Sequence, residues 1–225
     1  MSNIFRCEFM GDQWGPWEDS HVIPVLPRNF EQELSTVSFL TLDGDEHCFV
    51  YDPDAQYVAW CTWDGDGWSE WQDTSKLPAS PNYLVEDVEI PAFLSMGMMD
   101  AEPAMFSYQP EDDTLFISFW DGQRFSHWEE FAPVEAPPNL SEASDVFAVG
   151  DPNNTWLLAI DLEEWSIYYC SWDAEVEAFS DWIEAPSLSL PEEWYDMGGI
   201  DIDGNSVDGG LFVYATVYEI EDEDF

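Results

Sequence analysis

Four tryptophan-rich segments recur along this chain at nearly constant spacing. They read WDGDGWSEW (63–71), WDGQRFSHW (120–128), WDAEVEAFSDW (172–182) and, in a shorter form, GDQWGPW (11–17). We name them the Trp63, Trp120, Trp172 and N-terminal motifs. Their last tryptophans are 54, 57 and 54 residues apart. Periods slightly above 50 residues are typical of β-propeller blades, so the spacing predicts a repeat architecture before it predicts a binding site.

Short alternating apolar runs surround each motif. VSFLTLD, HCFVYD and YVAWCTWD precede the Trp63 motif, separated by the turn-forming DGDE and DPDAQ, and GWSEWQD supplies a fourth strand. The same plan returns in two later sets. Each set ends in a proline-rich connector, KLPASP, APVEAPP or APSLSLP. Since proline removes a donor from the strand ladder, these connectors mark the passage from one sheet to the next.

The remaining strands are divided between the two ends of the chain. GGIDIDG and GLFVYATVYEI lie near the C-terminus, whereas NIFRCEFM and QWGPWED lie near the N-terminus. Two plus two strands complete a fourth blade and protect the sheet edges. We therefore predict one all-β domain over 1–225, a four-bladed β-propeller of four-stranded antiparallel blades whose last blade is closed by the N- and C-terminal strands. The predicted blades are 36–77, 90–133, 144–186, and 196–220 plus 3–20, with helix expected only as a turn near 28–35 or 191–196.

The W-D-G residues of the motifs are expected at the turn of the third hairpin. There, glycine tolerates a positive φ and aspartate bonds to the local backbone, while the flanking aromatic rings pack between neighbouring sheets. In this interpretation the tryptophans are structural. In the alternative, Trp63, Trp120 and Trp172 are exposed platforms that stack on sugars.

The stretch DGDGWSEWQDTSKLP also resembles the blades of propeller lectins, both the tectonin-like kind and the fungal fucose-binding kind. The resemblance covers about ten residues in each repeat and implies carbohydrate binding. Those lectins generally have more blades. In the fucose-binding kind an arginine and a glutamate accompany the aromatic ring of each sugar pocket, whereas here only Arg124 lies beside a motif.

The charge balance is extreme. Against 49 acids stand only four bases, which gives a formal net charge of −45; the bases are Arg6, Arg28, Lys76 and Arg124. Such a surface repels DNA, RNA and anionic membranes and attracts basic proteins or cations. The 45% hydrophobic content is enough for a folded core. Neither a signal peptide nor a run of ~20 apolar residues is present, so we expect a cytoplasmic protein, in the host cytoplasm if the source is viral.

No catalytic motif emerges. His21, His47 and His127 occupy non-equivalent places, and neither a zinc-protease helix motif, a serine nucleophile elbow nor a phosphate loop occurs. The cysteines, Cys7, Cys48, Cys61 and Cys170, are scattered and predict buried thiols. We expect a non-enzyme without a cofactor.

The strongest metal candidate is DIDGNSVDGG, where oxygen-bearing side chains surround a glycine. Its candidate ligands are Asp201, Asp203, Asn205 and Asp208. The stretch lacks the glutamate that closes an EF-hand loop at its twelfth position. A plain hairpin turn is therefore the preferred interpretation.

Three explanations of the acidity compete. In the first, the protein imitates nucleic acid and occupies the basic groove of a DNA- or RNA-handling protein. Surface scaling gives about 10,500 Å² and hence one net charge per roughly 230 Å², against one per ~110 Å² on duplex DNA. In the second, the protein is a propeller lectin whose acidity is incidental. In the third, it is an acidic scaffold adapted to high salt, although 13 tryptophans are unusual for such adaptation.

We favour the first explanation, an inhibitor of the kind that viruses and mobile elements direct against host defence. Its partner would be a basic, nucleic-acid-binding protein, reached by electrostatic steering and salt-dependent docking. The predicted contacts are acids at strand ends and connectors, which we place on the propeller rim. They are Asp52, Asp54, Glu111, Asp112, Asp113, Glu163, Glu164, Glu192, Glu193, Glu221, Asp222, Glu223 and Asp224.

Overall fold

A computed structural model describes most of the chain. The described residues are 3–10, 13–22, 36–42, 44–52, 57–73, 93–100, 102–140, 144–151, 154–161, 166–186, 188–191, 199–207 and 210–218.

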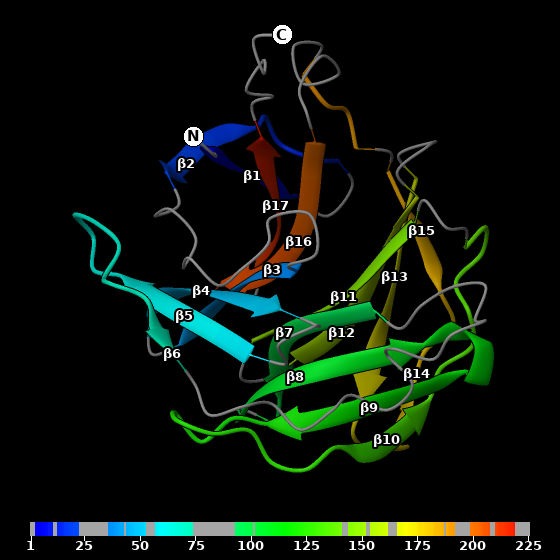
Figure 1. Ribbon diagram of the computed structural model, residues 1–225. Helices are drawn as coiled ribbons and strands as arrows, with labels where there is room; N and C mark the ends of the chain where they lie inside the picture. Colours follow the sequence, from blue (N-terminus) through cyan, green and yellow to red (C-terminus); the bar gives the residue numbers. More distant parts are fainter. Residues whose placement is uncertain are drawn as a thin grey trace, which may run out of the picture.

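The described residues form four antiparallel sheets (Figure 1). The first sheet runs in the order β3 (Thr36–Leu42), β4 (Asp45–Asp52), β5 (Tyr57–Trp63), β6 (Gln72–Asp73). The second sheet contains β7 (Phe93–Met99), β8 (Glu102–Gln109), β9 (Thr114–Phe119) and β10 (Glu129–Pro133). The third contains β11 (Ser144–Asp151), β12 (Asn154–Asp161), β13 (Ser166–Asp173) and β14 (Ala178–Phe179), with β15 (Ile183–Ala185) also paired to β13. The fourth contains β16 (Gly199–Val207), β17 (Gly210–Tyr218), β1 (Asn3–Phe9) and β2 (Glu18–Val22).

The all-β prediction, with several antiparallel sheets, is confirmed. Strands from the two ends of the chain share the fourth sheet, where β1 pairs with β17 from Asn3↔Val217 to Phe9↔Leu211. The division of apolar runs between the termini had predicted this pairing. The third sheet differs from expectation by its fifth strand, because β13 is long enough to pair with β14 at one end and β15 at the other.

Helical structure is limited to a short turn in the part of the chain that the structure describes. It is a 3-10 turn at Pro110–Asp112, which follows the buried strand β8. The helical turns predicted near 28–35 and 191–196 lie outside the described residues, apart from residue 191. No described helix is long and apolar enough to cross a membrane.

The first strands of the four sheets contact one another in a cycle: β3 contacts β7, β7 contacts β11, β11 contacts β16, and β16 contacts β3. Serine hydroxyls connect neighbouring strands at two of these contacts, β3 with β7 and β7 with β11. Ser38 accepts from the Met96 amide at 3.2 Å, and Ser95 accepts from the Ala148 amide at 2.7 Å. At Gly97 the approach is so close that a Cβ atom would lie 3.1 Å from the Cβ of Ala148. A larger residue there would force the second and third sheets apart.

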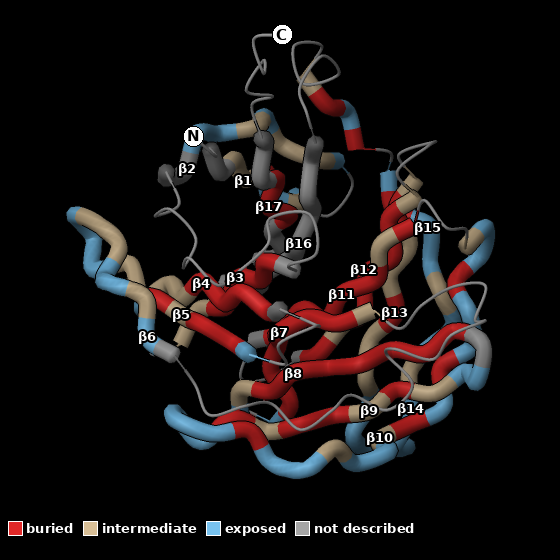
Figure 2. Tube along the Cα trace, viewed as in Figure 1, coloured by how far each residue is buried: buried red, intermediate tan, exposed pale blue. Residues whose placement is uncertain are grey.

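Hydrophobic clusters fill the spaces between neighbouring sheets. The cluster between the first and second sheets includes Phe49, Met96 and Trp120. Clusters of the same kind join the second sheet to the third, the third to the fourth, and the fourth to the first. In Figure 2 the buried residues follow the central strands, whereas the motif turns and outer strands are exposed. The hydrophobic core therefore consists of four clusters between neighbouring sheets, and the outer strands and motif turns form much of the exposed surface.

Candidate functional site

The Trp motifs have a common construction. In each of them an aromatic residue at the end of a long strand faces a second aromatic residue across the following turn. The pairs are Phe9 and Trp14, Trp63 and Trp68, Trp120 and Phe125, and Trp172 and Phe179, with ring centroids 4.9, 5.6, 6.5 and 5.2 Å apart. Pairs at such distances stabilise a hairpin beyond the area that they bury. The repeat is thus a structural unit in three dimensions.

The turns have the geometry that the sequence predicts. Gly65 and Gly122 adopt φ values of 99° and 95°, in the left-handed region that favours glycine. Asp64 accepts from the amides of Asp66 at 3.0 Å and Gly67 at 2.9 Å. These hydrogen bonds to the charged carboxylate lower the pKa of Asp64 below its usual value. Asp121 makes the equivalent pair of bonds, and its pKa is lowered for the same reason.

Packing between sheets accounts for Trp120 and Trp172. Trp120 is only 7% exposed, and its ring lies edge-on to Phe49 at 5.2 Å and Trp60 at 5.4 Å, both in the first sheet. Trp172 is half-buried and packs on Phe131 of the second sheet at 4.5 Å. The structural interpretation of these two tryptophans is confirmed, because each joins its own sheet to the preceding one.

Indole N–H groups hold the connectors in place. Trp182, the last residue of the Trp172 motif, donates to the carbonyl of Glu135 at 2.8 Å. Trp17, its equivalent in the N-terminal motif, donates to the carbonyl of Ser189 at 2.9 Å. In both cases the acceptor belongs to the connector that leaves the preceding sheet. The sequence had placed these tryptophans among packing residues and missed their role as hydrogen-bond donors.

The thiols belong to the same repeat. Cys7, Cys61 and Cys170 each lie two residues before the first member of an aromatic pair, namely Phe9, Trp63 and Trp172, and Ser118 has the same place before Trp120. Cys7 donates to the carbonyl of Gly15 at 3.0 Å, as Ser118 does to that of Ser126 at 2.7 Å. The prediction of buried thiols is confirmed for all four cysteines. Burial raises the pKa of Cys7 to about 11 and of Cys170 to about 12, so both thiols stay protonated near neutral pH.

The histidines occupy unlike environments. His47 is half-buried in the first sheet, with its ring 5.7 Å from that of Trp60, whereas His127 is exposed in the Trp120 motif. His21 lies in β2. Nothing brings His47 and His127 together as a catalytic or metal-binding pair.

Few of the predicted contact acids fall on described side chains. Asp112 and Asp113 are exposed after β8. Asp113, with a φ of 49°, accepts from the amide of Ala136 through its carboxylate and from that of Val134 through its carbonyl, so it fixes the chain beyond β10. Asp52 ends β4 and Glu111 lies in the 3-10 turn. The others, Asp54, Glu163, Glu164, Glu192, Glu193, Glu221, Asp222, Glu223 and Asp224, lie outside the described residues.

The stretch considered for a metal runs through a strand. Asp201, Asp203 and Asn205 lie in β16, which pairs with β17 without interruption from Gly199↔Tyr218 to Val207↔Gly210. The two strands of a hairpin are present, and their pairing continues past Gly204 as far as Val207↔Gly210. Asp208 lies outside the described residues. Where side chains are described, no group of three His, Cys, Asp or Glu residues could hold a metal ion.

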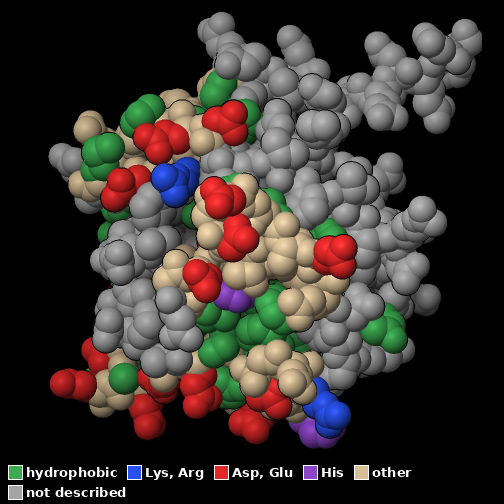
Figure 3. Space-filling model, turned by 90° about the vertical axis from the view of Figure 1, so that its left-hand side faces the viewer, with side chains coloured by type: hydrophobic (Ala, Val, Ile, Leu, Met, Phe, Trp, Pro, Cys, Tyr) green, Lys and Arg blue, Asp and Glu red, His purple; other side chains and the backbone are tan. Residues whose placement is uncertain are grey.

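Exposed carboxylates gather on the motifs and outer strands. Twenty described acids are exposed, whereas Arg124 is the one exposed base among the described residues. The acids of the motifs and of β10 and β15 are Asp64, Asp66, Glu70, Asp121, Glu129, Glu130, Asp173, Glu175, Glu177, Asp181 and Glu184. In the face shown in Figure 3, acidic side chains extend from one end to the other. One of the exposed acids is paired with a base: Glu18 lies 3.6 Å from the guanidinium of Arg6 in the neighbouring strand.

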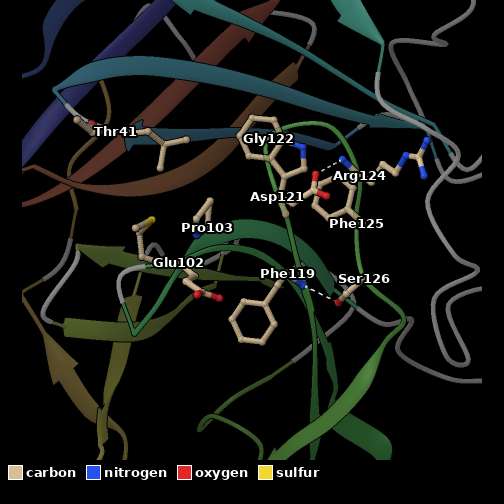
Figure 4. Close-up of a pocket in the computed structure, with 12 residues that line it drawn as sticks. Thr41, Glu102, Pro103, Phe119, Asp121, Gly122, Arg124, Phe125 and Ser126 are labelled. Atoms are coloured by element: carbon tan, nitrogen blue, oxygen red, sulfur yellow. Dashed lines mark hydrogen bonds between the residues drawn. The ribbon is translucent and has the colours of Figure 1, made fainter.

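A cleft of about 780 Å³ lies where the Trp120 motif meets the first sheet (Figure 4). Aromatic side chains of Phe119, Trp120 and Phe125 line it, together with Glu102 and Arg124. Figure 4 shows the guanidinium of Arg124 directed away from Glu102. The cleft thus has apolar walls and two carboxylates, those of Glu102 and Asp121, and the guanidinium of Arg124 does not point toward Glu102.

Comparisons with known proteins add little. No family model and no curated protein matches the chain. One similar solved structure is that of a luciferin-regenerating enzyme, with 10% identity, a TM-score of 0.35, and coverage of 80% of this chain and 68% of that one. A similarity of this extent carries no argument about fold or activity, so the non-enzymatic interpretation remains a proposal.

Proposed function

We propose that the four sheets are the blades of a single four-bladed β-propeller formed by residues 1–225. The cyclic contact of β3, β7, β11 and β16 supports this arrangement, since the innermost strands of propeller blades surround a common axis. The hydrophobic clusters at all four sheet interfaces also support it. Such a ring is a rigid frame on which surface groups keep fixed positions.

We further propose that the protein is a non-enzymatic inhibitor that imitates nucleic acid and occupies the basic groove of a DNA- or RNA-handling protein, in the manner of viral anti-defence proteins. The observation that carries this proposal is the excess of exposed carboxylates, twenty described acids against one exposed base. Carboxylates held on a rigid frame steer a cationic partner and compete with phosphates for its arginines and lysines. No ion pair of a motif acid is described, and Asp64, Asp121 and Asp173 are held by turn amides; the other exposed acids of the motifs can make that contact.

A competition experiment tests the inhibitor proposal. The immobilised protein is exposed to lysate at low salt, bound proteins are eluted in salt steps, and each eluted protein is then assayed for duplex DNA or RNA binding with and without the inhibitor. We expect a captured nucleic-acid-binding protein whose binding is inhibited, with the inhibition weakening as salt rises. Capture without inhibition, or inhibition that is insensitive to salt, would contradict the proposal.

The cleft beside Trp120 favours carbohydrate binding as a second candidate function. Its aromatic walls could face the apolar side of a sugar ring, and Glu102 could accept hydroxyl hydrogen bonds. A glycan array followed by elution with free sugar tests this candidate. Sugar binding that is lost in Phe119→Ala but retained in a variant of the exposed acids Glu129 and Glu130 would favour it over the inhibitor.

A further inference from the structure

The Trp172 motif departs from its relatives by an insertion. Six residues separate Trp172 from Phe179, whereas four separate the paired aromatics of the Trp63 and Trp120 motifs. The shorter turns already place the aromatic pair and form the hydrogen bonds of the repeat. The other motifs therefore form the same aromatic pair with two fewer residues in the turn.

The inserted turn carries an exposed hydrophobic side chain among acids. Val176 is 68% exposed, the largest value among the exposed large hydrophobic residues of the described chain. Asp173, Glu175 and Glu177, which surround it in sequence, are exposed as well. A single exposed hydrophobic residue is common on protein surfaces, so Val176 matters here only together with its acidic neighbours and with a second exposed hydrophobic residue, Ile183, in the same sheet.

Glu177 is one of four described non-glycine residues with a positive φ; the others are Asp100, Asp113 and Asn139. The φ of Glu177 is 52°, in the left-handed region where a side chain is strained and glycine is not. In the shorter turns this conformation falls on Gly65 and Gly122. The longer turn thus has a charged residue at a positive φ where the shorter turns have glycine.

The neighbouring edge of the third sheet repeats this chemistry. Ile183 in β15 is 50% exposed, and Asp181 and Glu184 beside it are exposed. Ile183 pairs with Tyr169 of β13. Asp173 lies four residues after Tyr169 in the same strand, so these two residues of β13 are roughly 13 Å apart. Because β14 and β15 both pair with β13, the turn that carries Val176 and the strand that carries Ile183 lie along the same outer edge of the third sheet.

This edge contains no lysine or arginine of its own. The four lysines and arginines of the chain all precede residue 125, so the third sheet contains none. Among the described residues, none of the five acids at 173, 175, 177, 181 and 184 forms an ion pair. The Trp120 motif is unlike it, since Arg124 lies in its turn and no large hydrophobic residue there is exposed.

We propose that residues 173–184, the acidic edge, are a docking surface for an extended basic segment of a partner protein, in which lysines or arginines flank a hydrophobic residue. The acids complement the cations, and Val176, the more exposed of the two hydrophobic residues, receives the hydrophobic side chain. A metal ion or free polyamine would contact the carboxylates alone and not Val176. This proposal rests on the proposed function and specifies which surface makes the contact.

Two peptides and two charge-matched double variants test the acidic edge. The peptides are KRLRK and KRGRK, which differ only in the central leucine, and binding is measured by fluorescence anisotropy at low and at physiological salt. Glu175→Gln/Glu177→Gly removes two charges from the edge, whereas Glu129→Gln/Glu130→Gln removes two exposed charges from β10. We expect the edge variant to weaken KRLRK binding at least tenfold and the β10 variant less than threefold, with KRGRK bound at least fivefold more weakly than KRLRK by the unaltered protein.

The outcomes separate the two proposals. Equal losses from the edge and β10 variants, or equal binding of the two peptides, would overturn the acidic edge while leaving the inhibitor proposal intact. An unaltered protein that binds neither peptide and also fails to inhibit the captured nucleic-acid-binding protein would overturn both. Unfolding would not explain a loss of peptide binding by the edge variant. Glu177→Gly relieves a strained φ, and thermal unfolding verifies that the variant stays folded.

Discussion

The Trp120 and Trp172 motifs share their construction and differ in their surface. Both face one aromatic residue with another across a turn, and in both a serine amide donates to the strand before it, Ser126 to Phe119 and Ser180 to Ser171. The Trp120 turn is short, with glycine at its positive φ and an arginine. The Trp172 turn is longer, with glutamate at its positive φ and an exposed valine. The comparison separates what the repeat needs in order to fold from what one copy has added.

The largest effect should come from the first tryptophan of each motif. Trp120→Ala removes a ring that is 7% exposed and in contact with Phe49 and Trp60, and we expect a loss of about 3–5 kcal/mol in the free energy of unfolding. Trp172→Ala removes a half-buried ring and should cost less, about 1–3 kcal/mol. Urea unfolding of the two variants gives both values. Equal losses would mean that the two interfaces between sheets are equally close-packed.

The comparison extends to the innermost strands, where a pH effect of intermediate size is expected. β7 has no charged residue, whereas β11 contains Asp145, whose pKa burial raises to about 6. Because the folded protein binds this proton more tightly than the unfolded chain, protonated Asp145 contributes to the free energy of unfolding. This contribution is complete below pH 3.8 and is lost as the pH rises through about 6. At pH 7 the ionised carboxylate is therefore destabilising. We expect Asp145→Asn to stabilise the protein by about 1–3 kcal/mol at pH 7.

The pH profile of that difference contains its own control. Acidification also relieves repulsion among the other acids, but that effect is common to both proteins and cancels when the variant is compared with the unaltered chain. The advantage of Asp145→Asn should shrink as the pH falls below 6 and vanish near pH 4. A difference that is constant over this range would show that the carboxylate is not desolvated.

The sequence predicted the sheets because their signals are local and periodic. Turn residues, alternating apolar runs and a repeat near 54 residues are all visible without coordinates. The indole bond of Trp182 to Glu135 was missed because it joins residues 47 positions apart through a connector with no pattern of its own. The place of Cys7, Cys61 and Cys170 in the repeat could have been found, since each lies two residues before an aromatic residue that ends a predicted strand.

Surface function was harder to predict, since it depends on exposure. Acid runs at strand ends directed attention to Asp112 and Asp113, yet Asp113 is engaged with the amide of Ala136. The exposed Val176 lies inside a motif that was interpreted as structural as a whole. A comparison of repeat lengths, four residues against six between the paired aromatics, was the sequence signal that could have indicated it.

The smallest effect, and the sharpest in sign, concerns the turn residue itself. Glu177→Gly releases a side chain from the left-handed region, which is worth roughly 1–2 kcal/mol, and loses about 0.5–1 kcal/mol to the greater entropy of the unfolded chain. A net gain of about 0.5 kcal/mol is expected from these opposing terms. Gly122→Ala makes the opposite change in the Trp120 turn, at a φ of 95°, and should destabilise the protein by about 1 kcal/mol or more. Thermal unfolding of both variants measures the two signs. If Glu177→Gly is destabilising instead, the glutamate is held by contacts within the fold, and the loop is part of the architecture like the turns that it was compared with.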